Sequence, residues 1–227
     1  MKRTFFITGT DTGTGKTVLT ALLAHFLREG GKNPAAFKPV CSGGRSDALA
    51  LQAALGGTLA LDEINPWHFR AAIAPLLAAR REKKTVTLTT VLAHLRQAQR
   101  RFEVVLVEGA GGLLSPLGED FDSRDLLIAL RAAPIIVAPN QLGAVNHLLL
   151  TLAALPKTFR DRAQIVLMTP AKPDAATTSN EKLLGNYFQG DQIFRLPWLG
   201  ENMESGALWK QIRVRRVLAR LMDAAFL

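Results

Sequence analysis

The sequence predicts an α/β fold in which a mostly parallel, doubly wound sheet has helices on both faces. Two observations support this prediction. Short apolar segments alternate with longer segments of helical periodicity along the whole chain of 227 residues. The apolar segments are continuous runs without polar alternation, which is typical of strands covered on both faces. In such a sheet we expect ligands to bind at the carboxyl ends of the strands.

The expected elements follow one another in regular order. The expected strands are short apolar runs, at residues 5–7, 35–37, 104–107, 135–138, 165–167 and 193–196. The expected helices are the longer segments between them, at residues 16–29, 47–55, 73–81, 88–99, 122–130, 145–155, 180–187 and 208–226. Paired glycines follow the first two helices and end them. Because we find no internal repeat, low-complexity segment or linker, we expect residues 1–227 to form one domain.

Composition narrows the class of protein. Hydrophobic residues make up 48% of the chain, enough for a substantial core. No apolar run approaches the roughly 20 residues of a membrane span, and the first residues lead directly into the first expected strand, so we expect no signal peptide. A single cysteine, Cys41, excludes an internal disulfide and is typical of a reducing compartment. We therefore expect a cytoplasmic protein without a membrane partner.

The chain is strongly basic, with a formal net charge of +9 and an isoelectric point of about 10.2. Such a charge raises the question of nucleic-acid binding. Basic residues cluster at residues 80–84, 100–101 and 213–216, but only 7% of the residues are aromatic and no recognised nucleic-acid module is present. We interpret the clusters as solvated helix faces and expect no nucleic-acid partner.

A glycine-rich segment, residues 8–17, lies between the first expected strand and the first expected helix. It ends in Gly15-Lys16-Thr17, and this context is typical of the phosphate-binding loop of nucleoside triphosphatases. Backbone N–H groups and the helix N-terminus would hold the phosphates, Lys16 would reach the β- and γ-phosphates, and the Thr17 hydroxyl would hold Mg²⁺. The alternative is an ordinary glycine-rich turn. The loop is longer than the common pattern, because Thr10 stands where glycine is expected and Gly9 lies one residue further out.

Three further segments follow strands and should converge on the phosphate loop. Lys38 ends the second strand before a Ser-Gly turn, which suits an anionic reacting group; a surface lysine is the alternative. Glu108 ends the next strand, where such folds place an acid near Mg²⁺, and glycines after it allow close approach of a ligand. The third segment, residues 140–147, is equally compatible with a plain helix start near Asn146.

Six motifs occur in a fixed order along nearly the whole chain. They are the lengthened loop at residues 9–17, Phe-Lys-Pro-Val-Cys-Ser-Gly at 37–43, Ser-Asp-Ala at 46–48, Val-Glu-Gly-Ala-Gly-Gly at 107–112, Leu-Gly with Asn-His at 142–147, and Pro-Trp-Leu-Gly-Glu-Asn at 197–202. Together they closely resemble the dethiobiotin synthetase family of the biotin pathway. The most specific part of this resemblance is the combination of the long loop with the motifs at 37–43 and 107–112.

The resemblance implies an ATP-dependent ligase that acts on 7,8-diaminopelargonic acid, a vicinal diamine. CO₂ would add to one amine as a carbamate, whose oxygen would attack the γ-phosphate of ATP to give a carbamic–phosphoric anhydride. The second amine would then close the cyclic urea and expel phosphate. Such chemistry asks a protein mainly to position charged partners and to offset charge on the moving phosphoryl group.

The resemblance also implies roles for individual residues. The catalytic residues would be Lys16, Lys38 and Thr12. The Mg²⁺ ligands would be Thr17, Asp47 and Glu108. The substrate would contact Thr12, Lys38, Ser42 and Gly111, together with Gly143 and Asn146 of the partner subunit in a homodimer with shared active sites. The nucleotide would contact Gly13, Thr14, Gly15, Lys16, Thr17, Val18, Thr169, Pro197, Leu199, Glu201 and Asn202.

Two segments depart from the pattern of the family. Thr169-Pro170 stands where the family usually has an asparagine that reads adenine, and a hydroxyl cannot form the paired contact of an amide with a base edge. The sequence therefore leaves open whether the base must be adenine. Residues 71–76, which border the substrate region, lack the polar residues often found beside Pro75.

Two other classes of protein share parts of this pattern. Partition or septum-site switch ATPases have a lengthened loop, but they usually carry a further lysine where this chain has Asp11. Their Walker B strand usually ends in aspartate, where this chain has Glu108. Cobyrinate-type amidases need a glutaminase half with a nucleophilic cysteine, and Cys41 has no room for such a domain around it. We therefore favour the ligase and keep the switch ATPase as the alternative.

Overall fold

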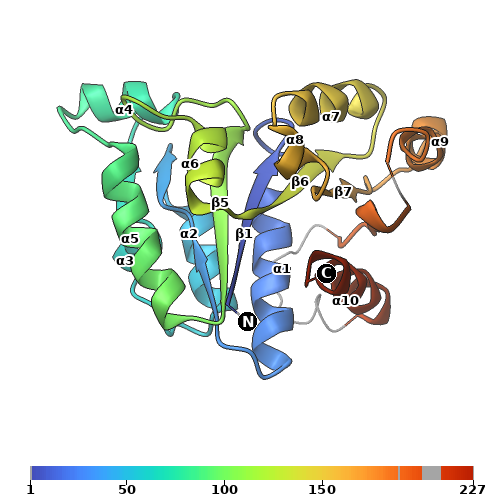
Figure 1. Ribbon diagram of the computed structural model, residues 1–227, viewed down its shortest axis with the longest axis horizontal. Coiled ribbons are helices and arrows are strands. Elements are labelled where there is room, and N and C mark those ends of the chain that lie inside the picture. Colours follow the sequence, from blue (N-terminus) through green and yellow to red (C-terminus); the bar gives the residue numbers. More distant parts are fainter. Residues whose placement is uncertain (1, 189, 201–210, 227) are drawn as a thin grey trace.

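Six parallel strands form the central sheet of the computed structural model, in the order β2-β5-β1-β6-β7-β8 (Figure 1). The structure describes residues 2–188, 190–200 and 211–226. The strands of this sheet are β1 (Arg3–Gly9), β2 (Pro34–Phe37), β5 (Val104–Gly112), β6 (Ala133–Pro139), β7 (Gln164–Met168) and β8 (Ile193–Leu196). The predicted α/β fold with a mostly parallel sheet is confirmed.

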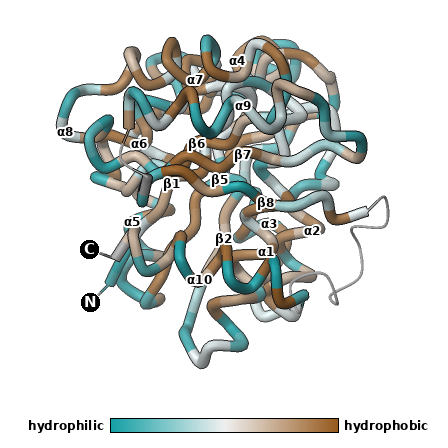
Figure 2. Tube along the Cα trace, turned by 90° about the vertical axis from the view of Figure 1, so that its right-hand side faces the viewer, coloured by the Kyte–Doolittle hydropathy of each residue, from teal (hydrophilic) through white to brown (hydrophobic). Residues whose placement is uncertain are grey.

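Helices cover both faces of the sheet. They are α1 (Lys16–Glu29), α2 (Ser46–Ala54), α3 (Leu61–Ile64), α4 (Pro75–Arg81), α5 (Leu88–Arg101), α6 (Ser123–Leu130), α7 (Ala144–Ala153), α8 (Lys157–Arg160), α9 (Ala175–Leu184), the 3₁₀ turn η1 (Gly190–Gln192) and α10 (Ile212–Phe226). Figure 2 shows α5, α6 and α8 on one side of the sheet and α1 and α2 on the other. This division follows from right-handed crossovers, because the chain moves outward from β1 to β2 and then back to β5.

The core lies between these layers. Phe5, Phe6 and Ile7 of β1 are fully buried, as continuous apolar strands require when both sheet faces are covered. Helix α5 is amphipathic instead. Its buried residues Val91 and Leu95 lie four positions apart and belong to one apolar face that packs toward the sheet. The apolar colouring in Figure 2 follows the central strands in the same way.

Several helix boundaries differ from the expected ones. Helix α9 begins at Ala175, five residues before the expected start, because Asp174 forms a capping box with Thr177. It also ends at Leu184, three residues before the expected end. Helix α4 begins at Pro75, since proline suits the first turn, where its missing N–H is not needed. The expected start of the last helix at residue 208 lies outside the described residues.

Two further differences concern strands near the site. A small parallel sheet pairs β3 (Val40–Ser42) with β4 (Trp67–Phe69), and sequence reasoning missed it because three-residue strands have no clear periodicity. Strand β5 extends five residues past its expected end. Its register with β1 shifts after the pair of Ile7 and Glu108, so the glycines beyond Glu108 form an irregular tip.

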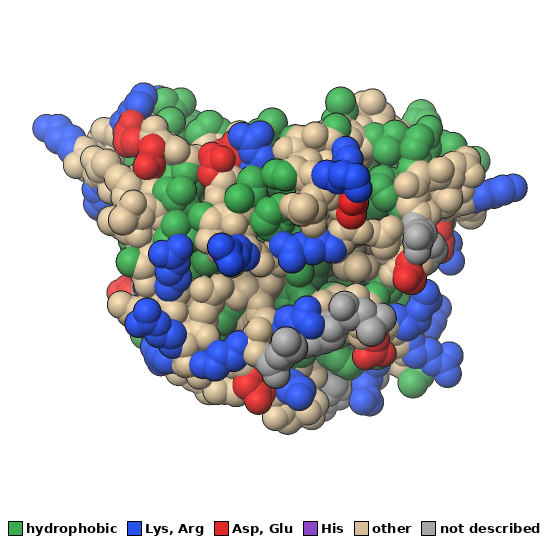
Figure 3. Space-filling model, viewed as in Figure 1, with side chains coloured by type: hydrophobic (Ala, Val, Ile, Leu, Met, Phe, Trp, Pro, Cys, Tyr) green, Lys and Arg blue, Asp and Glu red, His purple; other side chains and the backbone are tan. Residues whose placement is uncertain are grey.

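The basic cluster at residues 80–84 lies on the surface, as expected. The Arg80 guanidinium pairs with Glu119 at 2.6 Å, and the Lys84 amine pairs with Glu82 at 3.3 Å. Figure 3 shows many Lys and Arg side chains dispersed over one face, with acidic side chains beside some of them. In the part of the chain that the structure describes, no helix is long and apolar enough to cross a membrane.

Candidate functional site

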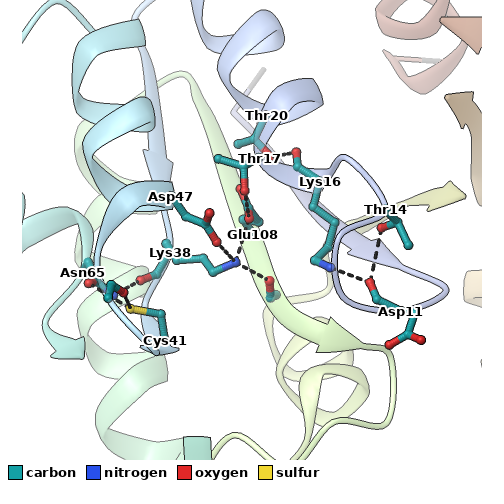
Figure 4. Close-up of polar contacts among 12 residues, drawn as sticks. Asp11, Thr14, Lys16, Thr17, Thr20, Lys38, Cys41, Asp47, Asn65 and Glu108 are labelled. Atoms are coloured by element: carbon teal, nitrogen blue, oxygen red, sulfur yellow. Dashed lines mark hydrogen bonds and ion pairs between the residues drawn. The ribbon is translucent and has the colours of Figure 1, made fainter. Parts of the chain in front are cut away.

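The phosphate loop joins the end of β1 to the start of α1 (Figure 4). Gly15, directly before the helix, has a left-handed backbone with φ of +95°. A Cβ atom at Gly15 would lie 2.9 Å from the end of the Met168 side chain. Backbone conformation and limited space therefore both favour glycine at this position.

Lys16 folds back onto its own loop. Its amine donates a hydrogen bond to the Asp11 carbonyl at 2.7 Å, and the Thr14 hydroxyl donates to the same carbonyl at 3.3 Å. The pKa of Lys16 is lowered to about 8, mainly by burial and then by the positive charge of Lys38, while Glu108 acts in the opposite direction. An anion bound beside Lys16 would favour its protonated form.

Lys38 is almost completely buried between two carboxylates. Its amine lies 2.7 Å from Glu108 Oε1 and 2.8 Å from Asp47 Oδ2, and it donates to the Gly109 carbonyl at 3.0 Å. Burial lowers the pKa of Lys38, but Glu108 and then Asp47 more than offset this and raise the pKa above its usual value. Burial acts to raise the pKa of Asp47, yet Lys38 holds that pKa below its usual value. Lys38 is thus a permanently charged group inside the site.

The residues expected to hold a metal ion lie around Lys38. The Thr17 hydroxyl donates to Glu108 Oε1 at 2.7 Å. The other oxygen, Glu108 Oε2, is buried without a hydrogen-bond partner in the described structure. Two carboxylates and a hydroxyl are the oxygen ligands that Mg²⁺ prefers, so the chemistry of this set fits the ion. No group of three His, Cys, Asp or Glu residues suited to a metal occurs within the described ranges, so phosphate and water oxygens must complete such a site.

A cavity of about 780 Å³ lies between the phosphate loop and Lys38. The structure brings most of the predicted residues to it: Thr12, Gly13, Gly15, Lys16, Thr17, Val18, Lys38, Ser42, Asp47 and Gly111. Of the residues predicted to contact the phosphates or Mg²⁺, Thr14 and Glu108 do not line it: the Thr14 hydroxyl faces its own loop, and Glu108 lies behind Lys38. The opposite wall is apolar and consists of the four residues 72–75.

A second cavity, of about 490 Å³, lies beyond the end of β7. Thr169 and Pro197 both line it, with Trp198 and Arg195 beside them. The Thr169 hydroxyl oxygen is buried and has no hydrogen-bond partner in the described structure. Of the other residues expected here, Leu199 is buried and does not line the cavity, whereas Glu201 and Asn202 lie outside the described residues.

Gly143 and Asn146 lie at the start of α7 and line neither of these two cavities. Both are exposed. They stand beside two exposed apolar side chains, Leu142 and Leu150, which are 85% and 63% accessible. Within one chain the structure therefore does not bring Gly143 and Asn146 to the phosphate loop.

Comparison with known proteins gives the family. Residues 3–204 match a family described as an AAA domain. A protein from Akkermansia muciniphila named ATP-dependent dethiobiotin synthetase BioD is 42% identical over 200 residues, which cover 88% of this chain and 91% of that protein. The chain belongs to the dethiobiotin synthetase family. A BioD from Xylella fastidiosa is also 42% identical, over 66% of this chain and 70% of its own length.

This family membership confirms the resemblance inferred from the six motifs. It also confirms the expected class of enzyme, an ATP-dependent ligase. Solved structures show the fold. The ParA protein of pNOB8, solved bound to nonspecific DNA, superposes with a TM-score of 0.60 at 14% identity and covers 98% of this chain and 99% of its own. At this low sequence identity, the two proteins share the fold, and the comparison shows no more than that.

Sequence reasoning missed two polar residues of this candidate site. Asn65 is fully buried below Lys38, and its amide donates to the Lys38 carbonyl at 2.6 Å. The Ser115 hydroxyl accepts a hydrogen bond from the Gly112 N–H at 2.9 Å and lines the first cavity. A lone asparagine before a proline and a lone serine in a turn carry no signal that would have singled them out.

Proposed function

We propose that the protein makes dethiobiotin from 7,8-diaminopelargonic acid, CO₂ and ATP. The observation that carries the proposal is one cavity lined by a phosphate loop and by two buried lysines, Lys16 and Lys38. The reaction consumes two anions, a carbamate and a triphosphate, and two fixed positive charges offset their repulsion. The likeness to relatives named dethiobiotin synthetase over most of the chain supports this substrate choice.

The bonds change in three steps. One amine adds to CO₂ and loses a proton, which gives a carbamate. A carbamate oxygen bonds to the γ-phosphorus while the bond to ADP breaks, with Lys16 and Lys38 offsetting charge on the moving group. The second amine then attacks the carbamate carbon, the C–O bond to phosphate breaks, and a proton is lost as the cyclic urea closes. Thr12 borders the reacting groups from the loop.

Thr17, Asp47 and Glu108 would hold Mg²⁺, which when bound neutralises part of the charge on the phosphates. Glu108 would contribute a carboxylate oxygen, and its Oε2 atom has no hydrogen-bond partner in the described structure. Lys38 already pairs with both carboxylates, so it would keep the two acids together. The nucleotide phosphates would contact residues 13–18 of the loop.

The substrate would lie along the other side of the cavity. Ser42 and Gly111 would contact the diamine, and the apolar wall at residues 72–75 suits its alkyl chain. Gly143 and Asn146 of the partner subunit would reach the carboxylate tail. The exposed Leu142 supports a homodimer that forms through this face.

The base of the nucleotide would occupy the second cavity. Thr169 and Pro197 would contact it, with Leu199, Glu201 and Asn202 contributing from the segment that follows β8. Because the Thr169 hydroxyl supplies one hydrogen bond and not the pair that an amide offers, nucleotides other than ATP should also be substrates. The single free cysteine supports a cytoplasmic location.

The test measures phosphate release with Mg²⁺ and bicarbonate, with and without the diamine, and assays dethiobiotin in the same tube. The proposal expects release that depends on the diamine, with one dethiobiotin formed for each phosphate. Slow release that ignores the diamine would instead support a switch ATPase of the ParA kind. Lys38→Ala should abolish product formation while nucleotide binding at the loop persists.

A further inference from the structure

Asn65 occupies the centre of a buried hydrogen-bond network beneath the site (Figure 4). It lies between α3 and β4. Its side-chain N–H donates to the Lys38 carbonyl at 2.6 Å, and its side-chain oxygen accepts from Cys41 Sγ at 3.2 Å and from Arg45 Nε at 3.2 Å. One amide therefore contacts three points of one segment.

That segment, residues 38–47, carries three residues of the proposed site. Lys38 stands at its start, Ser42 near its middle and Asp47 at its end. The contacts of Asn65 fall beside each of them, at the Lys38 carbonyl, at Cys41 next to Ser42, and at Arg45, the residue directly before α2. Between Lys38 and the start of α2, the segment forms only one short strand, β3, so its shape depends on contacts from outside.

Arg45 adds a second layer to the same network. Its guanidinium donates to the backbone carbonyls of Leu61 at 2.9 Å and Asn65 at 3.0 Å, and it pairs with Asp62 at 2.8 Å. The loop that carries Asn65 is thereby fixed to the start of α2. Asn65 and Arg45 together tie the two ends of the segment to one rigid point.

We propose that Asn65 is a positioning residue that sets the place of Lys38 and Asp47 relative to the phosphate loop. The inference rests on the proposed function, because it assigns those two residues to the reaction. An amide is needed, since one side chain must donate to a carbonyl and accept from two donors at once. Aspartate has nearly the same shape, but its carboxylate cannot donate to the Lys38 carbonyl.

The test compares Asn65→Asp with the wild-type protein. Displacement of the reacting groups by about 1 Å can cost about a hundredfold in rate, so kcat should fall by about ten- to a hundredfold. The affinity for ADP without Mg²⁺, measured by calorimetry, should change by less than about twofold. This nucleotide would contact the phosphate loop and neither Lys38 nor Asp47, and the loop makes no hydrogen bond to Asn65 among the described contacts. The ratio of these two effects separates positioning from general loss of structure.

Gln52→Glu is the matched control. Gln52 is a partly buried amide on α2 that donates to the Leu59 carbonyl at 3.0 Å, and the substitution makes the same chemical change away from the segment. It should leave kcat within about twofold of the wild-type value. If Asn65→Asp does not fold, Arg45→Met is the second variant, because it removes the donor to Asn65 Oδ1. It should lower kcat while the affinity for ADP without Mg²⁺ is retained.

Three results would overturn the inference. One is a folded Asn65→Asp, or a folded Arg45→Met, with kcat within twofold of wild type. Another is a fall in kcat matched by an equal fall in the affinity for ADP without Mg²⁺, which would reflect unfolding alone. A wild-type protein without diamine-dependent turnover refutes the proposed function, and the inference falls with it.

Discussion

Replacing Lys38 by methionine should separate the structural role of this lysine from its chemical role. Lys38 is 3% exposed and neutralises Glu108, which is 0% exposed, at 2.7 Å. Removal of the lysine leaves a buried carboxylate without its cation. Asp47 contributes much less, because its side chain is 42% exposed and water screens its charge.

The magnitude follows from the burial of the pair. Removing one partner of a buried ion pair costs about 3–5 kcal/mol, mainly because the remaining charge is uncompensated. For a protein of this size, each kcal/mol lowers the melting temperature by roughly 2–4 °C. A loss of about 4 kcal/mol therefore lowers the melting temperature of Lys38→Met by roughly 8–16 °C.

The double variant Lys38→Met with Glu108→Gln is the companion measurement. A glutamine can still accept the hydrogen bond from Thr17, and no buried charge remains. The double variant should recover at least about 2 kcal/mol of the lost stability, because neutral replacements of buried ion pairs are often tolerated. Both variants should lack ligase activity.

Urea unfolding followed by tryptophan fluorescence measures both variants, together with calorimetric melting. If Lys38→Met is as stable as the wild-type protein within about 1 kcal/mol, Glu108 does not depend on Lys38 for its charge balance. If the double variant is no more stable than the single one, the loss comes from packing of the lysine stem and the electrostatic reasoning is wrong.

Three further predictions concern the nucleotide. The affinity for MgATP should fall above pH 8, by up to about tenfold per pH unit, because Lys16, with its pKa lowered to about 8, is neutral above that pH. Calorimetry across this pH range measures the fall. Lys16→Arg should remove the pH dependence, because arginine stays charged. Gly15→Ala should weaken MgATP binding and lower the melting temperature more than Gly13→Ala. Both glycines have positive φ, which costs about 1–2 kcal/mol for alanine, but only the former Cβ would meet Met168. Thr169→Asn should raise the kcat/KM ratio of ATP over CTP by about tenfold, the value of one added hydrogen bond; an unchanged ratio would place the base elsewhere.

The order and type of the elements could be predicted because they depend on local patterns. A continuous apolar run predicted the strand at residues 104–107. The short strand expected at residues 193–196, which contains the exposed Arg195, matches β8 residue for residue. Predicted element boundaries were wrong where a side chain at one position forms a hydrogen bond with the backbone at another position. The capping box of Asp174 moved the start of α9, and the pairing of β3 with β4 needs two segments that are far apart in sequence.

The phosphate loop, the family and the candidate site residues could all be recognised from the sequence, because each depends on short motifs that follow strands. How those residues meet depends on the tertiary structure. Lys38 reaches Glu108 across 70 positions and Asn65 reaches Lys38 across 27, so no local pattern records either contact. The physical reason is that a buried charge or amide without a hydrogen-bond or ion-pair partner costs free energy, and the fold determines which group becomes that partner.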